Sequence, residues 1–335
     1  MNIGVWLYGS VPLATSVIVP LGILLHYWRV ADARPLRARS GWAEGAVVWT
    51  AAARGQLRRA RIASALATVA VLTSTFGVIP PNRYGMEWHD FLAPMLAVLL
   101  CTAVLLTRPP AVGRVDTAAP FADSVQAGER RAQSMGAFGE RWWFVAWTLC
   151  LAALVIAVCW AGLVSTSDDD GHYTMHTIEV EEATGGTTIA GWYFGVPVLI
   201  SAVLLVALVL FAFRLLTAPP LAADGGQDLW LRCAATRTLL SLSGGAVVVT
   251  LAWVLLSIGN AAQIMLSVPS ADDGGMTTLG SPLAPISVPV RVLGLLLQGI
   301  GIALVLLPLF SRLPRSTGVS VLDESAELQT EQGAP

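Results

Sequence analysis

The sequence predicts an all-α membrane protein with seven transmembrane helices, because of its composition and its long charge-free segments. The chain has 335 residues, of which 55% are hydrophobic and only 13% are charged, a composition outside the range of soluble globular proteins. A helix of about 20 apolar residues crosses a bilayer core of about 30 Å. Seven segments of this kind lack Asp, Glu, Lys and Arg, at residues 6–28, 62–80, 91–107, 142–164, 192–213, 239–266 and 292–311.

The positions of arginine predict how these helices are oriented. All twenty basic residues are Arg, and only Arg83 and Arg291 lie outside the segments that share a side with the C-terminus. Because cytoplasmic loops carry the excess of Arg and Lys, we expect the N-terminus outside the cell and the C-terminus inside. Residues 1–311 then form the membrane domain. Residues 312–335 lack apolar periodicity, which predicts a disordered cytoplasmic tail.

A short internal similarity suggests how the helices are grouped. The segments LLTRPPAV (105–112) and LLTAPPLA (215–222) match at five of eight positions, each at the inner end of a predicted helix. Such repetition favours three helical hairpins of like orientation, followed by a seventh helix. Proline also commonly ends helices at membrane boundaries, and this is the alternative explanation of the similarity.

The inner loop that precedes the second predicted helix is rich in arginine. Residues 41–61 combine helical spacing of Trp and Ala with a cluster formed by Arg54, Arg58, Arg59 and Arg61. This pattern is typical of a segment that contacts anionic lipid headgroups. Nucleic-acid binding is disfavoured, because eight Arg are spread over thirty-three residues with few aromatic side chains to stack on bases.

The outer loop at residues 165–191 contains the acidic stretch DDDGHYTMHTIEVEE (168–182). Its three aspartates remain hydrated if the loop lies outside the membrane. Alternation in HYTMHTIEV, followed by Gly185 and Gly186, predicts a short strand and turn, and hence a small β-hairpin.

Histidines in the outer loops are weak candidates for a divalent-cation site. His172 and His176 share a face of the predicted strand, and His89 lies in the loop between the second and third helices. A zinc-binding helix with this spacing would also carry a Glu between the histidines, whereas Tyr173, Thr174 and Met175 intervene here. The main alternative is a hydrated acidic loop, and we expect no bound metal or cofactor.

A small set of amides is the polar feature of the last two predicted helices. Asn260 and Gln263 belong to the sixth helix and Gln298 to the seventh. Asn260 and Gln298 are expected at similar depth, so an interhelical hydrogen bond between them would stabilise packing by about 0.6 to 2 kcal/mol. Glycines on the same two helices, among them Gly244, Gly245 and Gly294, predict close contact between them.

Catalytic patterns are missing from the sequence. Cys101, Cys150 and Cys159 lie within predicted helices, Cys233 is on the inner side, and none has a His nearby in the sequence. The chain has neither a phosphate-binding glycine loop nor an HExxH motif. We therefore expect that the protein is not an enzyme.

The passage HTIEVEEATGGTTIAGWYFGVPVLI (176–200), together with Ala-rich helices and Arg in place of Lys, resembles uncharacterised multi-pass membrane proteins of high-GC actinobacteria. This resemblance is best over the fourth and fifth predicted helices. It implies a location in the bacterial cell membrane and carries over no catalytic or binding residue.

These patterns favour a non-enzymatic accessory or signalling role, in which the outer loops meet a ligand or protein partner. The inner arginines would meet lipid headgroups or a cytoplasmic partner. The alternative is a transporter or permease subunit for an apolar or amphipathic solute, which needs no charge within the membrane. A third possibility is a metal-binding protein or enzyme on the outer face, in which His89, His172 and His176 converge.

Overall fold

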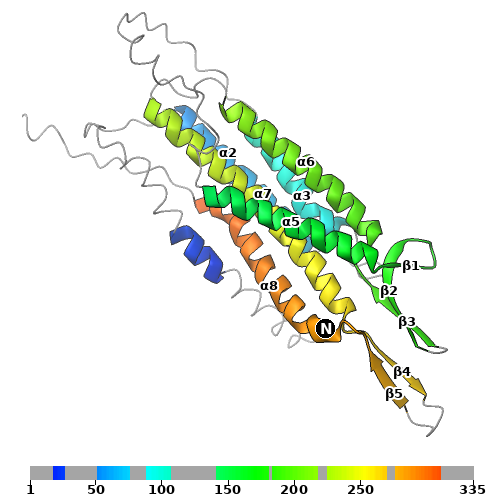
Figure 1. Cartoon of the computed structure of the whole chain (residues 1–335). Coiled ribbons are helices and arrows are strands. Elements are labelled where there is room, and N and C mark those ends of the chain that lie inside the picture. The colour runs from blue at the N-terminus through cyan, green and yellow to red at the C-terminus, as the bar shows by residue number, and fades with distance from the viewer. Residues whose placement is uncertain are drawn as a thin grey trace, which may run out of the picture.

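The computed structural model describes residues 18–26, 51–75, 88–106, 141–180, 183–217, 225–269 and 276–310. In these ranges the protein is a bundle of long helices with two small antiparallel sheets at one end (Figure 1). Residues 18–26 are helical. The other helices are α2 (Ala51–Thr75), α3 (Trp88–Leu106), α5 (Arg141–Leu163), α6 (Trp192–Thr217), α7 (Gly225–Ala261), α8 (Ala284–Leu306) and the short 3-10 helix η2 (Leu307–Phe310).

Four helical spans are long and apolar enough to cross a membrane. They are Arg141–Leu163, Trp192–Leu216, Leu231–Ala261 and Ala284–Phe310. The expected membrane-helix character is confirmed for these spans, whose lengths of 23 to 31 residues exceed the need of a bilayer core. Helices α2 and α3 contain the described parts of the segments 62–80 and 91–107. The predicted tail at 312–335 and most of the segment 6–28 lie outside the described residues.

Helix α7 is the centre of the bundle. Every residue from Thr238 to Ala252 is buried, and α7 packs against α2, α3, α5, α6 and α8. A helix that is buried on all sides needs small residues where its neighbours approach most closely. The segment Ser241–Ala246 supplies two serines, two glycines and an alanine for this purpose.

Helices α7 and α8 form the most extensive contact, and glycines set its closeness. A Cβ atom on Gly245 would lie 2.6 Å from Val305 Cγ2, and one on Gly301 would lie 2.6 Å from Val249 Cγ2. Neither position has room for a larger residue. The expected glycine contact between these two helices is therefore confirmed at these positions.

Two other glycines refine this expectation. Gly294 also belongs to the seam, by which we mean the contact between α7 and α8, because a Cβ there would lie 2.9 Å from Leu256 Cγ on α7. Gly244 instead faces α5, where Trp147 Cδ1 would lie 3.5 Å from an added Cβ. Adjacent residues point about 100° apart on a helix, so Gly244 and Gly245 contact different neighbours.

Pro308 ends α8 and leaves two carbonyl groups without their usual donors. Proline has no N–H, so the carbonyl of Leu304, four residues earlier, loses its helical partner. The chain continues as the 3-10 helix η2, where the donor three residues after Val305 would be Pro308, which has no N–H. Hydroxyl groups of neighbouring helices replace both partners: Ser241 of α7 donates to Leu304 O, and Ser64 of α2 donates to Val305 O.

The two sheets form what we call the sheet cap, at one end of the bundle (Figure 1). Strands β1 (Thr166–Ser167), β2 (Tyr173–Val180) and β3 (Ala183–Thr188) form an antiparallel sheet in the order β1-β2-β3. Strands β4 (Met265–Pro269) and β5 (Met276–Gly280) form a hairpin. The predicted hairpin between the fourth and fifth helices is thus present, whereas β4 and β5 were not predicted.

The turn of the first hairpin is not at the predicted position. Val180 pairs with Ala183, so the chain reverses between these residues, and Gly185 and Gly186 lie inside β3. Glycine inside a strand often marks a place where another group approaches closely. That is the case here, because Leu266 and Met175 side chains pack over these two positions.

The last two predicted spans also have different bounds in the structure. The segment 239–266 was predicted to be helical throughout, but α7 ends at Ala261 and β4 begins at Met265. The segment 292–311 was predicted to begin eight residues later than α8 does. Pro285 suits the first turn of a helix, where its missing N–H costs nothing, so α8 starts at Ala284.

The grouping of helices differs from three consecutive hairpins. Helix α3 packs mainly against α2, α6 and α7, and α5 packs mainly against α6 and α7. The second expected hairpin pairs the third and fourth predicted helices, which correspond to α3 and α5. This pair is not among the extensive contacts of the described residues. Because α7 occupies the centre, α3 and α5 are each packed against it rather than against one another.

Candidate functional site

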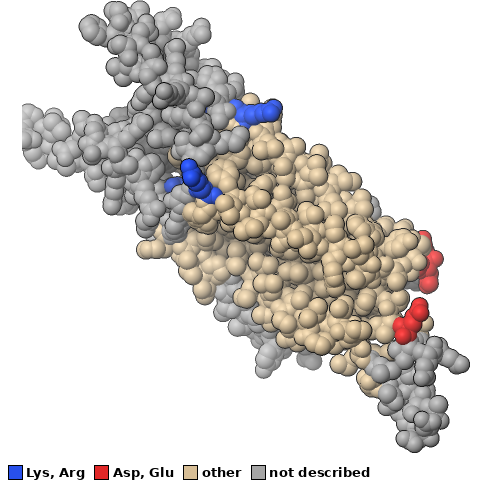
Figure 2. Space-filling model, in the orientation of Figure 1, with Lys and Arg blue, Asp and Glu red and all other residues tan. Residues whose placement is uncertain are grey.

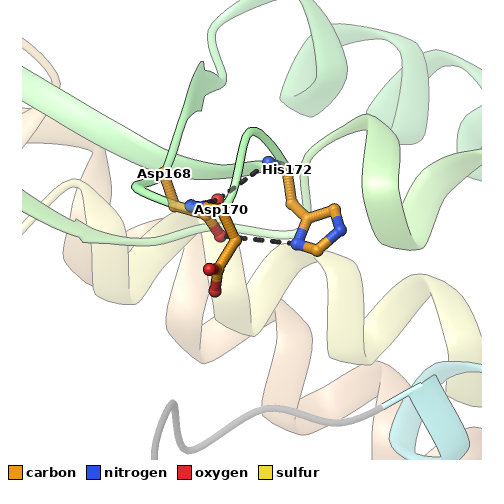
Figure 3. Close-up of side chains that lie close together, drawn as sticks. All are labelled: Asp168, Asp170 and His172. Carbon is orange, nitrogen blue, oxygen red and sulfur yellow. Dashed lines mark hydrogen bonds and ion pairs between the residues drawn. The ribbon is translucent and has the colours of Figure 1, made fainter.

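The connection between β1 and β2 is a tight turn organised by Asp168 (Figure 3). Asp168 Oδ1 accepts hydrogen bonds from the backbone N–H groups of Asp170 at 3.0 Å and His172 at 2.8 Å. Its Oδ2 accepts a hydrogen bond from the Thr174 hydroxyl at 2.7 Å. Gly171 has a φ of 78°, a conformation that glycine adopts without strain. The DDDGH sequence is therefore suited to this turn.

These hydrogen bonds determine the acidity of Asp168. The hydroxyl of Thr174 lowers the pKa of the Asp168 carboxyl below its ordinary value, and the backbone N–H groups of His172 and Asp170 act in the same direction. Each of these donors stabilises the ionised form. The turn is therefore built around a carboxylate that is charged at neutral pH.

Asp168, Asp170 and His172 are also the one group of described residues whose side chains are close enough to share a metal ion. One ligand atom from each lies within 4.8 Å of the others. Two carboxylates and an imidazole are chemically suited to a divalent cation. However, Asp170 and His172 are exposed, and the three hydrogen bonds of Asp168 account for its position as a turn residue.

The predicted histidine candidates are not brought together. His172 lies at the turn, with its ring centroid 4.4 Å from that of Tyr193. His176 lies in β2, with Nδ1 3.4 Å from Val164 O and Nε2 buried without a hydrogen-bond partner. The close group contains His172 with two aspartates and not His176. The side chain of His89 lies outside the described residues.

The two sheets of the cap contact one another through a glycine. A Cβ on Gly185 of β3 would lie 2.8 Å from Leu266 Cδ1 of β4, so the Leu266 side chain occupies the space that glycine leaves. On the next residue, a Cβ on Gly186 would lie 2.8 Å from Met175 Cε. The two sheets of the cap therefore touch at Gly185.

The cap is also attached to the helices by hydrogen bonds and close packing. The backbone N–H of Ala190 donates to the Ser257 hydroxyl of α7 at 2.8 Å. A Cβ on Gly191 would lie 2.2 Å from Tyr173 O and 2.5 Å from Ser165 Cβ. Because these contacts are buried, β2 and β3 have a defined position at the ends of α6 and α7.

Most charged side chains of the described residues gather at opposite ends of the molecule, and Arg291, which donates to Gln263 close to β4, is an exception. Figure 2 shows Arg at the end away from the sheets and Asp and Glu at the sheet cap. The exposed acids of the cap are Asp169, Asp170 and Glu179. An acidic surface at this end favours a ligand or partner that carries positive charge.

The predicted arginine cluster lies in the first half of α2. Arg54, Arg58 and Arg61 are exposed, and Arg59 is half-buried. Elsewhere at this end, Arg232 of α7 is buried and donates to the carbonyl of Leu216 in the last turn of α6. Carbonyl groups at the end of a helix have no partner within it, so Arg232 caps α6.

The predicted amide pair does not form. Gln298 is only 2% exposed, in the seam between α8 and α7, whereas Asn260 is exposed. Among the described residues, no hydrogen bond joins them. Instead, Gln263 Oε1 accepts a hydrogen bond from Arg291 Nη1 at 2.7 Å. The sequence did not indicate this pair, because Arg291 was expected in a loop, whereas it lies in α8.

No protein-family model, no curated protein and no solved structure matches this chain.

Proposed function

We propose that the protein is a multi-pass protein of the bacterial cell membrane, with seven transmembrane helices, the N-terminus outside and the C-terminus inside. The four long apolar spans support membrane insertion. The separation of most Arg from Asp and Glu at opposite ends of the bundle supports the orientation, with the sheet cap outside.

Within this topology, the protein is a non-enzymatic accessory or signalling component, and the sheet cap is a docking surface for a protein partner. The observation that carries this proposal is the contact of Leu266 with Gly185, which links the two sheets of the cap. A preorganised surface loses little conformational entropy when it binds. The exposed acids Asp169, Asp170 and Glu179 favour a partner with a basic surface.

The opposite end supports a second, simpler contact. Arg54, Arg58 and Arg61 are exposed on α2, as suits side chains that meet anionic lipid headgroups or a cytoplasmic partner. The transporter alternative would be favoured by a continuous cavity lined by Asn260, Gln263 and Gln298. Gln298 is buried in a helix seam and Asn260 is exposed, which gives this alternative no support.

Site-specific photo-crosslinking in intact cells tests the docking proposal. A photoreactive amino acid replaces exposed Glu179 of the cap, and in a matched control it replaces Leu149, which is 64% exposed on α5. We expect a protein adduct from the cap position and none from Leu149, which faces lipid in the proposed topology. Charge reversal at Asp169 and Asp170 should lower the yield. The photoreactive amino acid is also placed at the exposed cap positions Asp169 and Thr184. If it captures no protein from any of the three cap positions, docking at the cap is contradicted.

A further inference from the structure

Arg291 is an unusual residue because it is the one ionisable side chain of α8 (Ala284–Leu306). Its spacing from Ser287, Gly294 and Gln298 places it on the stripe of α8 that faces α7. The contacts of Gly259 agree, because a Cβ on this α7 residue would lie 2.5 Å from Arg291 Cγ and 3.1 Å from Ser287 O. Gly259 therefore forms a notch in α7 through which the aliphatic part of Arg291 passes.

The guanidinium is held at the end of this notch by an amide. Arg291 Nη1 donates to Gln263 Oε1 at 2.7 Å. Gln263 is itself positioned in the turn that ends α7, where its backbone N–H donates to Asn260 O at 3.1 Å. The notch and the hydrogen bond together restrict the rotamers of a side chain that would otherwise be mobile.

The partner of this positive charge is neutral. Among the described residues, no carboxylate lies within 4.0 Å of Arg291, and its hydrogen bond to Gln263 uses one of five N–H donors. A guanidinium close to apolar surface is stabilised most by an anionic acceptor, which can take two parallel hydrogen bonds. The site therefore provides donors for an anionic oxygen that no described residue supplies.

The exposed face of α8 near Arg291 is apolar. It carries Ile286, Val288, Val292, Leu293 and Leu296, which are 43 to 60% exposed. A suitable ligand therefore combines an anionic group with long apolar chains. A phospholipid has this chemistry, since its phosphate carries the charge and its acyl chains suit the exposed side chains.

We propose that Arg291 binds the phosphate of a phospholipid in the membrane leaflet at the sheet-cap end, with the acyl chains along α8. The exposed Asn260 side chain is adjacent to Gly259 and offers a second donor to the headgroup. This proposal rests on the membrane placement proposed above and not on docking at the cap. It adds a lipid site at the end of the molecule opposite to the arginine cluster of α2.

Photolabelling in liposomes tests this site. The probe is a phosphatidylglycerol with a photoreactive acyl chain, and adducts are mapped by mass spectrometry to α8 and, as an internal control, to α5. Val145 and Leu149 of α5 are 57% and 64% exposed. We expect Arg291→Gln to reduce labelling of α8 about tenfold, because charged hydrogen bonds are lost, while labelling of α5 is unchanged. Arg291→Lys should retain part of the labelling.

Additional experiments distinguish a lipid phosphate from inorganic phosphate, and distinguish loss of the phosphate contact from unfolding of the variant. Millimolar inorganic phosphate should not displace the probe, and a diacylglycerol probe without phosphate should label α8 equally in wild type and Arg291→Gln. Equal phosphatidylglycerol labelling of α8 in both proteins, or displacement by inorganic phosphate, would overturn the proposal. If the phosphatidylglycerol probe labels neither α8 nor α5, the proposed membrane placement itself is wrong. Thermal unfolding of each variant checks that it is folded.

Discussion

Asp168 illustrates how one side chain organises a segment of this protein. Its two carboxylate oxygens accept three hydrogen bonds from Asp170, His172 and Thr174. The neighbouring Asp169 is exposed, and its side chain has no comparable contacts among the described residues. Two adjacent acids in the same run therefore have different roles, one in the turn and one on the surface.

Replacement of Asp168 by Ala should loosen the β1–β2 turn. All three hydrogen bonds are lost, so we expect faster hydrogen exchange of the Asp170 and His172 amides and of β2, measured by mass spectrometry at neutral pH. Asp169→Ala is the matched control and should leave exchange unchanged. Equal exchange in the two variants would contradict the role of Asp168.

The same turn should be sensitive to acid. The folded pKa of Asp168 is lower than its ordinary value of 3.8, so its contribution to stability is present above that pH. It is lost as pH falls through the folded pKa, because protonation removes the charge that accepts these bonds. We expect protection of the turn amides, corrected for intrinsic exchange, to fall below this pH in wild type and not in Asp168→Asn.

The strands and helices obtain their positions from contacts that involve residues distant in sequence. β3 contains two consecutive glycines, which weaken a strand when they are considered locally. The strand forms because Leu266 and Met175 fill the space above Gly185 and Gly186. Likewise, the end of α8 depends on hydroxyl groups from α7 and α2.

A larger residue at Gly185 should separate the two sheets of the cap. A Cβ there would lie 2.8 Å from Leu266 Cδ1, so we expect Gly185→Val to destabilise the cap by about 1 to 3 kcal/mol through overpacking. Leu266→Ala should relieve part of this cost in the double variant. Hydrogen exchange of β3 and β4 measures the effect, and additive losses in the double variant would contradict direct contact.

The Ser241 hydroxyl should matter only because Pro308 is present. Ser241→Ala removes the donor to Leu304 O, and we expect a loss of about 1 kcal/mol in stability, measured by unfolding in detergent. Pro308→Ala supplies a backbone N–H that can bond to the same carbonyl. In the Pro308→Ala variant, Ser241→Ala should therefore lower the stability much less than it does in wild type. An equal loss of stability in both proteins would disprove the coupling.

The whole molecule has two chemically different ends joined by an apolar bundle. The sheet cap carries exposed acids, the other end carries arginines, and α7 connects them through a buried core (Figures 1 and 2). Many apolar side chains remain exposed on α5, α6 and α8. Such extended exposure is expected of helices in contact with lipid and not of a soluble surface.

Cysteine labelling tests the orientation of the whole chain. The four native cysteines are free, so they are first replaced to give a background without reactive thiols. We expect Asp169→Cys in the cap to react with a membrane-impermeant maleimide on intact cells. Arg54→Cys on α2 should react only after the membrane is permeabilised. The reverse pattern would invert the proposed topology.

Local properties of the sequence were sufficient to predict four of the apolar spans, the sorting of arginine in the sequence and a hairpin between residues 165 and 191. Hydropathy, charge and alternation depend on neighbouring residues, so they can be recognised without a fold. The central position of α7, the pairing of Gln263 with Arg291 and the place of Gly185 within a strand depended on the tertiary structure. Each depends on which distant residues pack together, and a glycine or an amide is compatible with several partners until the helices and sheets are assembled.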